Sequence, residues 1–166
     1  MIFWGLQSRA GLMLAATTVA IDQLHKSWMI GFLSDRGRSK IELAPFFDIV
    51  MVWNKGVSYG LLKQDSPAGR WALIGFAIVA VLVLVSWLAT LIDRLPALGV
   101  GFIIGGALSN AIDRIHYGAV ADFFSFHAGG YYWYVFNLAD AAIVIGVAGL
   151  LYGALKSGHK RVGNQT

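Results

Sequence analysis

The chain has 166 residues, of which 57% are hydrophobic and only 13% are charged, and its formal net charge at pH 7 is +4. A soluble domain carries about 25% charged residues, so this composition predicts an integral membrane protein of one domain. The absence of cysteine excludes disulfides, thiolate metal sites and cysteine nucleophiles. The small and scattered positive charge indicates contact with lipid headgroups and argues against binding of nucleic acid.

Four stretches are long and apolar enough to cross a membrane, which takes about 20 residues. They cover approximately residues 11–33, 71–92, 95–112 and 136–155. Asp22 and Lys26 interrupt the first stretch, and no small-residue cleavage site follows it, so we interpret it as a retained helix and not as a signal peptide. The last two stretches carry small residues about every four positions, which predicts close helix packing: Gly101, Gly105, Ser109, Gly146, Gly149 and Gly153.

Two longer connections separate these stretches, at residues 34–70 and 113–135. The first is rich in β-branched and aromatic residues with Gly and Asn between them, which predicts short strands at the membrane surface. The second contains the aromatic run from Tyr131 to Tyr134, typical of an interfacial belt and alternatively of the lining of an apolar ligand site. Four spans place both connections on one side of the membrane and both termini on the other, but Lys and Arg occur on both sides and do not decide the orientation.

Asp122 and Asp140 are candidates for acid–base chemistry. Asp122 falls in the second connection, which we expect to be a loop there, and Asp140 follows Asn137 by three residues at the start of the fourth span. Two carboxylates that share a site raise the pKa of one of them, so one is protonated while the other is ionised. The ionised group can take a proton from water, and the protonated group can polarise a carbonyl and protonate the leaving nitrogen. A helix cap at Asp140 and a solvated Asp122 are the alternative interpretation.

Other polar residues lie near the same ends of the spans. Asp22 and Lys26, spaced i, i+4, are expected to pair within their helix. The end of the third span is expected to form structural hydrogen bonds or to clamp loop backbone, and Arg114 alternatively holds a lipid phosphate. Asn54, in a turn with Gly56, is a candidate to bind substrate backbone.

Two other functional classes remain open from the residues alone. In a small four-helix proton-coupled transporter, Asp22 would carry the proton, although such a carboxylate belongs near the midplane and these carboxylates gather at helix ends. In an interaction or scaffold subunit, the loop carboxylates would be dispensable. The histidines show no metal-ligand spacing: they are His25, His116, His127 and His159.

Five short motifs follow one another along most of the chain. They are DQLHK (22–26), NKGVSYG (54–60), GGALSNAIDR (105–114), VADFF (120–124) and FNLAD (136–140). In these motifs the chain resembles the lipoprotein signal peptidases (signal peptidase II), which are membrane aspartic proteases of bacteria. Ser109 stands where this family usually has glycine, and Val57, Ser58 and Tyr59 replace a commoner run. We expect these departures to affect the fit of the substrate and not the activity itself.

The resemblance implies an all-α integral membrane fold with four transmembrane helices, a small β-like periplasmic cradle and a periplasmic loop or helix over the site. It implies an enzyme of the bacterial inner membrane, with cytoplasmic termini and a site toward the periplasm, that cuts diacylglyceryl-modified prolipoproteins just before the lipidated cysteine. Asp122 and Asp140 would be the catalytic pair. The residues implied to support the site or the substrate are Asp22, Lys26, Asn54, Gly56, Asn110, Asp113, Arg114, Asn137 and Ala139. A monomer without metal or cofactor, inhibited by globomycin-type peptides, is expected.

Overall fold

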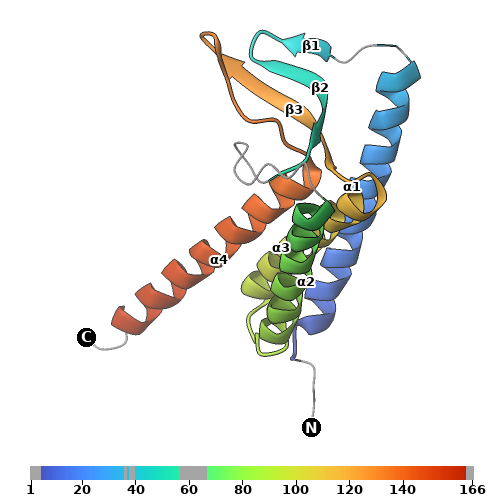
Figure 1. The fold of residues 1–166 in the computed structure, drawn as a ribbon. Helices are drawn as coiled ribbons and strands as arrows, with labels where there is room; N and C mark the ends of the chain where they lie inside the picture. Colours follow the sequence, from blue (N-terminus) through green and yellow to red (C-terminus); the bar gives the residue numbers. More distant parts are fainter. Residues whose placement is uncertain (1–4, 36, 38–39, 57–66, 164–166) are drawn as a thin grey trace.

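The computed structural model of the protein describes residues 5–35, 37, 40–56 and 67–163. Its elements in chain order are α1 (Ser8–Asp35), β1 (Lys40–Ala44), β2 (Phe47–Asn54), α2 (Pro67–Leu88), α3 (Arg94–His116), β3 (Val120–Ala128), β4 (Tyr131–Tyr132) and α4 (Leu138–Gly163). The strands stand at one end of the helices and both chain ends lie at the other (Figure 1). The described parts of the connections and the outer ends of α1 and α4 thus lie at opposite ends of the helices.

Helix α3 lies between α1 and α4, and glycine makes the close approach possible. A side chain at Gly101 would collide with the backbone of Gly11 in α1, and one at Gly106 would collide with the backbone oxygen of Ala139 in α4. On α4 the predicted stripe is tight only at Gly146, whose missing side chain leaves room for the oxygen of Gly99. Small residues at such positions let helix backbones approach within a membrane. The prediction of close packing is therefore confirmed on α3 and only in part on α4.

In the part of the chain that the structure describes, three helical segments are long and apolar enough to cross a membrane: Pro67–Leu88, Arg94–His116 and Leu138–Lys156. Helix α1 is longer than any of these, but it does not meet the same criterion of apolar character. Asp22 and Lys26, both buried, are the charges in its middle. The prediction of four apolar spans is thus supported for three helices. The remaining predicted span, residues 11–33, is an α-helix whose buried side mixes apolar residues with Asp22 and Lys26.

The helix bounds differ from the predicted spans by a few residues. Helix α2 begins and ends four residues before the predicted span of 71–92, because the chain turns between residues 89 and 93. Helix α3 extends four residues beyond the predicted end at 112, through its polar last turn. Helix α4 continues to Gly163, eight residues beyond the predicted end at 155.

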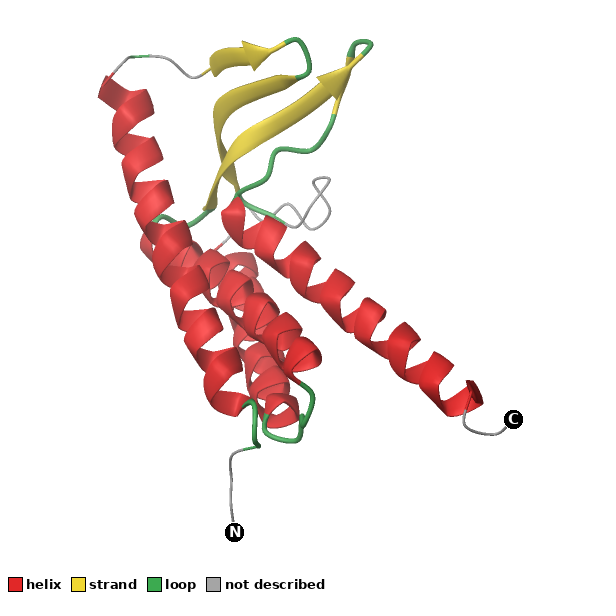
Figure 2. Ribbon diagram, turned by 180° about the vertical axis from the view of Figure 1, so that it is seen from behind, coloured by secondary structure: helices red, strands yellow, loops and turns green. Residues whose placement is uncertain are grey.

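The four described strands are antiparallel neighbours in the order β1, β2, β3, β4, and Figure 2 shows the sheet beyond one end of the helices. The two strands of the first connection confirm the prediction of short strands there. Strand β3 corrects the prediction that Asp122 lies in a loop, since it runs from Val120 to Ala128 and pairs with β2. The described parts of the two connections contain no helix besides the ends of α1, α2 and α3. Residues 57–66, which include Val57, Ser58 and Tyr59, lie outside the described residues.

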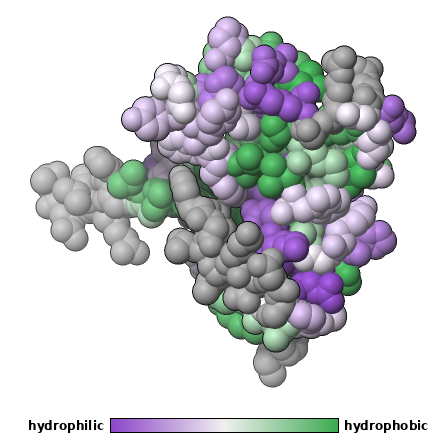
Figure 3. Space-filling view, turned by 45° about the horizontal axis from the view of Figure 1, so that its top comes forward, coloured by the Kyte–Doolittle hydropathy of each residue, from purple (hydrophilic) through white to green (hydrophobic). Residues whose placement is uncertain are grey.

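The sheet is fixed to the helices through the first half of β3. Phe123 is fully buried and packs in a cluster with Met29 and Leu33 from the end of α1. Fully burying side chains of this size stabilises a fold by about 1.5–3 kcal/mol each. The face of the molecule that carries the sheet mixes hydrophilic and hydrophobic side chains (Figure 3). The first half of β3 is therefore packed against the end of α1, and this positions Asp122.

Candidate active site

Asp122 lies on β3 with its carboxylate turned toward β2 and the start of α4. Asn54 on β2 is its diagonal neighbour, because Asn54 pairs with Val120 in the register. The Asn54 side-chain amide donates to Oδ2 at 3.0 Å, and the Asn137 amide donates to Oδ1 at 2.6 Å. Burial first, and then the charge of Asp140, raise the pKa of Asp122 to about 7, against the two amide hydrogen bonds and the charge of Lys26.

A short piece of sheet pairing brings the start of α4 to Asp122. Phe136 and Phe124 form an isolated bridge with reciprocal backbone hydrogen bonds of 2.9 and 3.0 Å. The next residue, Asn137, is fully buried and stands directly before α4. The chain therefore enters the helix alongside β3, within hydrogen-bonding distance of the carboxylate.

Asp140 is held in the first turn of α4 by a capping box with Asn137. The Asn137 side-chain oxygen accepts from the Asp140 backbone N–H at 3.0 Å, and the Asp140 carboxylate accepts from the Asn137 N–H at 3.2 Å. These reciprocal bonds satisfy two of the free donors at the helix end. The other carboxylate oxygen of Asp140 accepts from the Asn110 amide at 2.9 Å, and the Tyr134 hydroxyl donates to Oδ2 at 3.3 Å. Asp140 thus caps the helix and also takes part in a wider polar cluster.

Both carboxylates line one cavity of about 240 Å³. Its polar wall combines side chains from β2, α3, β3 and the start of α4, and its apolar wall comes mainly from α2, including Leu73 and Phe76. A cavity of this size has room for a water molecule and a peptide group, since a water in the liquid occupies about 30 Å³. The polar members of the lining are Asn54, Asn110, Arg114, Asp122, Tyr134 and Asp140.

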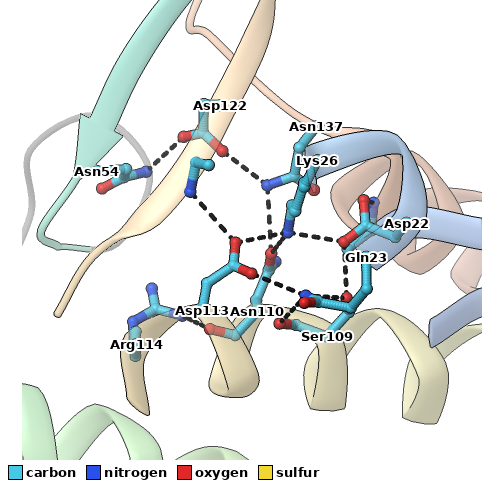
Figure 4. A network of polar contacts seen from close by, with 12 residues as sticks. Asp22, Gln23, Lys26, Asn54, Ser109, Asn110, Asp113, Arg114, Asp122 and Asn137 are labelled. Carbon is cyan, nitrogen blue, oxygen red and sulfur yellow. Dashed lines mark hydrogen bonds and ion pairs between the residues drawn. The ribbon is translucent and has the colours of Figure 1, made fainter. Parts of the chain in front are cut away.

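Beneath this cavity, Lys26 joins two buried aspartates (Figure 4). Its Nζ lies 2.7 Å from Asp22 Oδ2 and 2.7 Å from Asp113 Oδ2, and it donates to the Asn110 side-chain oxygen at 3.1 Å. The expected i, i+4 pair within α1 is therefore present, with Asp113 of α3 as an additional partner. All three charged side chains are at least 98% buried, so removing one would leave the others without compensation.

The two buried aspartates each hold the backbone one residue before a cavity carboxylate. Asp113 Oδ2 accepts from the N–H of Ala121 at 3.2 Å, next to Asp122. Asp22 Oδ1 accepts from the N–H of Ala139 at 2.9 Å, next to Asp140. The negative side chain of Asp22 also lies at the positive end of the helix dipole of α4. Lys26 pairs with both of these aspartates, so one buried cation links the side chains that hold the backbone beside Asp122 and Asp140.

Arg114 ties the end of α3 to the turn after β2. Its guanidinium donates to the backbone oxygen of Gly56 at 2.9 Å and to that of Asn110 at 3.2 Å. The Gly56 N–H in turn donates to the Asn54 side-chain oxygen at 3.0 Å, which directs the Asn54 amide to Asp122. Arg114 therefore clamps loop backbone, one of its expected roles.

The structure brings all the predicted site residues into one continuous network, in which Asn110 and Asn137 also bond to each other. The network also contains three residues beyond the predicted supporting set. They are Gln23, for which the sequence predicts no role, Ser109, for which it predicts helix packing and an effect on substrate fit, and Tyr134, for which it predicts an interfacial belt or the lining of an apolar ligand site. Gln23 donates to Asp113 at 2.7 Å and to the Ser109 hydroxyl at 2.9 Å, and Ser109 donates to Asp22 at 2.6 Å. Gln23 follows Asp22 directly in the first motif, which was the available signal. Among the described residues, no His, Cys, Asp or Glu cluster is arranged to hold a metal ion.

Comparison with known proteins gives a consistent result. The family model for signal peptidase (SPase) II matches residues 14–156. The lipoprotein signal peptidase of Methylobacterium sp. (strain 4-46) is 51% identical over 141 residues, covering 85% of this chain and 86% of the relative. That of Beijerinckia indica is 50% identical over 147 residues, covering 89% of this chain and 88% of the relative.

The fold also matches solved structures. Two structures of a bacterial membrane enzyme, obtained by the in meso method at 2.3 and 1.9 Å resolution, superpose with TM-scores of 0.76 and 0.75 at 24% identity. The first match covers 95% of this chain and 94% of the solved chain, and the second covers 94% and 98%. These likenesses support the fold of helices and small sheet. The family model matches most of this chain, and the two lipoprotein signal peptidases above are about half identical to it. The chain therefore belongs to the signal peptidase II family, the lipoprotein signal peptidases.

Proposed function

We propose that the protein is an aspartic endopeptidase that removes the signal peptide from diacylglyceryl-modified prolipoproteins by cutting just before the lipidated cysteine. The observation that carries this proposal is the pair of carboxylates, Asp122 and Asp140, on the wall of one small cavity. Each carboxylate comes from a different element, and each oxygen of the pair accepts a hydrogen bond from an amide or hydroxyl group. Such a pair can activate water without a metal.

We assign the proton of the pair to Asp122, whose pKa is raised to about 7. Asp140, in the first turn of α4, is the ionised member of the pair. It takes a proton from a water molecule while the oxygen of that water attacks the carbonyl carbon. Asp122 gives its proton to the carbonyl oxygen, forming a tetrahedral diol. Breakdown then returns one diol proton to Asp122, transfers the proton on Asp140 to the leaving nitrogen, and breaks the C–N bond. The products are a carboxylic acid and an amine, and both aspartates regain their starting states.

The supporting residues have roles in this proposal. Asn54 and Asn137 hold the carboxylate of Asp122, and Asn110 holds that of Asp140. Gly56 lines the cavity, and its carbonyl oxygen, which accepts from Arg114, has a second lone pair that can accept from an extended substrate segment. Two acyl chains anchored in the membrane would hold the scissile bond at a fixed depth, so their binding energy can support positioning at the reacting centre.

We further propose that the end of the molecule with the sheet faces the periplasm and that the termini are cytoplasmic. A lipidated substrate attached to the outer leaflet of the inner membrane would then meet the cavity directly. A monomer is sufficient, because every site residue named above comes from one chain. Globomycin-type peptides are expected to inhibit by occupying the same cavity.

The transporter alternative is not favoured by the surroundings of Asp22. A proton carrier must exchange its proton with water on both sides, but Asp22 is 1% exposed. Its carboxylate is engaged by Lys26, Ser109 and the N–H of Ala139. These contacts give Asp22 a structural role.

The test is cleavage of a purified diacylglyceryl-modified prolipoprotein in detergent, with mass spectrometry to identify the new N-terminus. Wild type should release a fragment that begins with the lipidated cysteine, and Asp122→Asn and Asp140→Asn should each lose at least about 10³-fold in kcat. Glu42→Gln, which changes an exposed acid on β1, is the matched control and should cleave normally. Intact substrate with folded wild-type protein, or near-normal cleavage by either Asn variant, would overturn the proposal.

A further inference from the structure

A second and larger cavity adjoins the candidate catalytic cavity. It has a volume of about 560 Å³, within the range of about 300–1,000 Å³ that ligand pockets occupy. One wall is aromatic and consists of Phe126, Trp133 and Phe136; the other is the side of α4 that presents Val144 and Ile145. The chemistry of these walls suits an apolar chain and offers little to a polar ligand.

The apolar cavity adjoins the catalytic one. Tyr134 and Asp140 line both, so the carboxylate of Asp140 stands at the boundary between them. A molecule whose reacting bond lies between Asp122 and Asp140 therefore has an apolar groove directly beside that bond. Along α4 the groove extends from Asp140 to Ile145, roughly 7–8 Å at 1.5 Å per residue.

The groove opens toward lipid. Val144 and Ile145 are 66% and 54% exposed, and they lie in the part of α4 that is apolar enough to span a membrane. An occupant can enter from the bilayer without crossing water. Among the described residues that line it, Asp140 is the one that carries a charge, so a phospholipid would bring its anionic phosphate close to a carboxylate. An acyl chain attached through an uncharged glyceryl group avoids this repulsion.

We propose that this groove binds one acyl chain of the lipidated substrate and so fixes the position of the scissile bond beside Asp140. The inference rests on the proposed function and adds to it the part of the protein that recognises the lipid. Because the bilayer is itself apolar, transfer of the chain from lipid to groove gains packing and not hydrophobic free energy. The groove therefore contributes mainly to the orientation of the substrate.

A kinetic test compares groove variants on substrates with different acyl chains. Ile145→Trp narrows the groove, and Leu151→Trp adds the same bulk at a lipid-exposed position of α4 outside the lining. With hexadecanoyl chains on the substrate, Ile145→Trp should lower kcat/KM about tenfold and Leu151→Trp should not. With butanoyl chains, the two variants should behave alike. Equal kinetics of the two variants on the long-chain substrate, or an Ile145→Trp defect that persists with butanoyl chains, would overturn the inference.

A binding test does not depend on turnover or on the fold of the variants. A substrate with a photoreactive diazirine in one acyl chain is irradiated with wild-type protein at low temperature, and the labelled peptides are identified by mass spectrometry. Label should appear on residues 144–145 and around Trp133, and unlabelled substrate should compete with it. Label confined to other helices, or label displaced by phospholipid but not by substrate, would overturn the inference. Failure of wild type to cleave any lipidated substrate would instead refute the proposed function.

Discussion

Replacing Asn137 by serine should separate the two roles of this residue. The Asn137 side-chain oxygen caps α4 through the Asp140 N–H, and its amide donates to Asp122 at 2.6 Å and to Asn110 at 3.2 Å. Serine retains an oxygen for the cap but has no amide that reaches Asp122, whereas alanine loses both. Asn137→Ser should therefore be more stable than Asn137→Ala by about 0.5–2 kcal/mol.

Loss of the Asn137 amide should change the pH dependence of cleavage. The charge of Asp140 helps to raise the pKa of Asp122 to about 7, so the proton that leaves near this pH is the last one shared by the pair. In wild type, kcat/KM should fall as the pH rises through about 7. The Asn137 hydrogen bond favours the ionised form of Asp122 and is worth about 1.5–3 kcal/mol, which corresponds to about one to two pH units. Both variants should move this limb upward by about that amount.

The assay is kcat/KM between pH 5 and pH 9 on a diacylglyceryl-modified prolipoprotein, with unfolding measured by denaturant titration in the same detergent. Asn137→Ser should show a shifted alkaline limb with a smaller loss of stability than Asn137→Ala. A limb that stays near pH 7 in both variants would refute the reasoning, because the Asn137 amide would then have no influence on the titrating carboxylate. Equal stability of the two variants would refute the capping role alone.

Three further perturbations test other parts of the network. Lys26→Met should lower the free energy of unfolding by about 3–5 kcal/mol, because it leaves the buried carboxylate of Asp22 without its cation; an unchanged denaturation midpoint would contradict this. Gly106→Ala should strongly reduce cleavage, because the added side chain would collide with the backbone of α4. Gly75→Ala is the control and should cleave normally, because the space around Gly75 is open. The two activities are compared at equal protein concentration. Ser109→Gly should cost about 0.5–3 kcal/mol through the hydroxyl lost to Asp22, and thermal unfolding that matches wild type would argue against that bond.

The helices and the candidate residues were accessible from the sequence, but the strand that carries Asp122 was not. The sequence analysis predicts a loop at Asp122 in the second connection, although Val120, Phe123 and Phe124 favour a strand. Its first residues are buried on both faces, so the alternation that marks a half-buried strand is absent. The pairing with β2 joins segments about 70 residues apart, and no local pattern specifies such a contact.

The position of α1 could be predicted only in part. Asp22 and Lys26 were expected to pair because of their spacing, and they do. Lys26 also pairs with Asp113, and this second pair forms only because α1 and α3 cross at that point. The glycines at the contact between the two helices set the crossing. Gln23 likewise acquires its role only because that crossing brings Ser109 within 2.9 Å. A single sequence contains these residues but not the register between the helices.

The buried charges explain how two carboxylates from distant segments can be held in a fixed relation. A carboxylate on a flexible loop would be drawn into water and away from a second negative charge. Here the backbone before Asp122 is bound by Asp113, and the backbone before Asp140 is bound by Asp22. The ammonium group of Lys26 lies 2.7 Å from a carboxylate oxygen of Asp22 and 2.7 Å from one of Asp113, and it neutralises their charge. The repulsion within the pair is thus opposed by hydrogen bonds that burial strengthens by excluding water. The stability of this network and the protonation state of the pair are therefore properties of the same buried cluster.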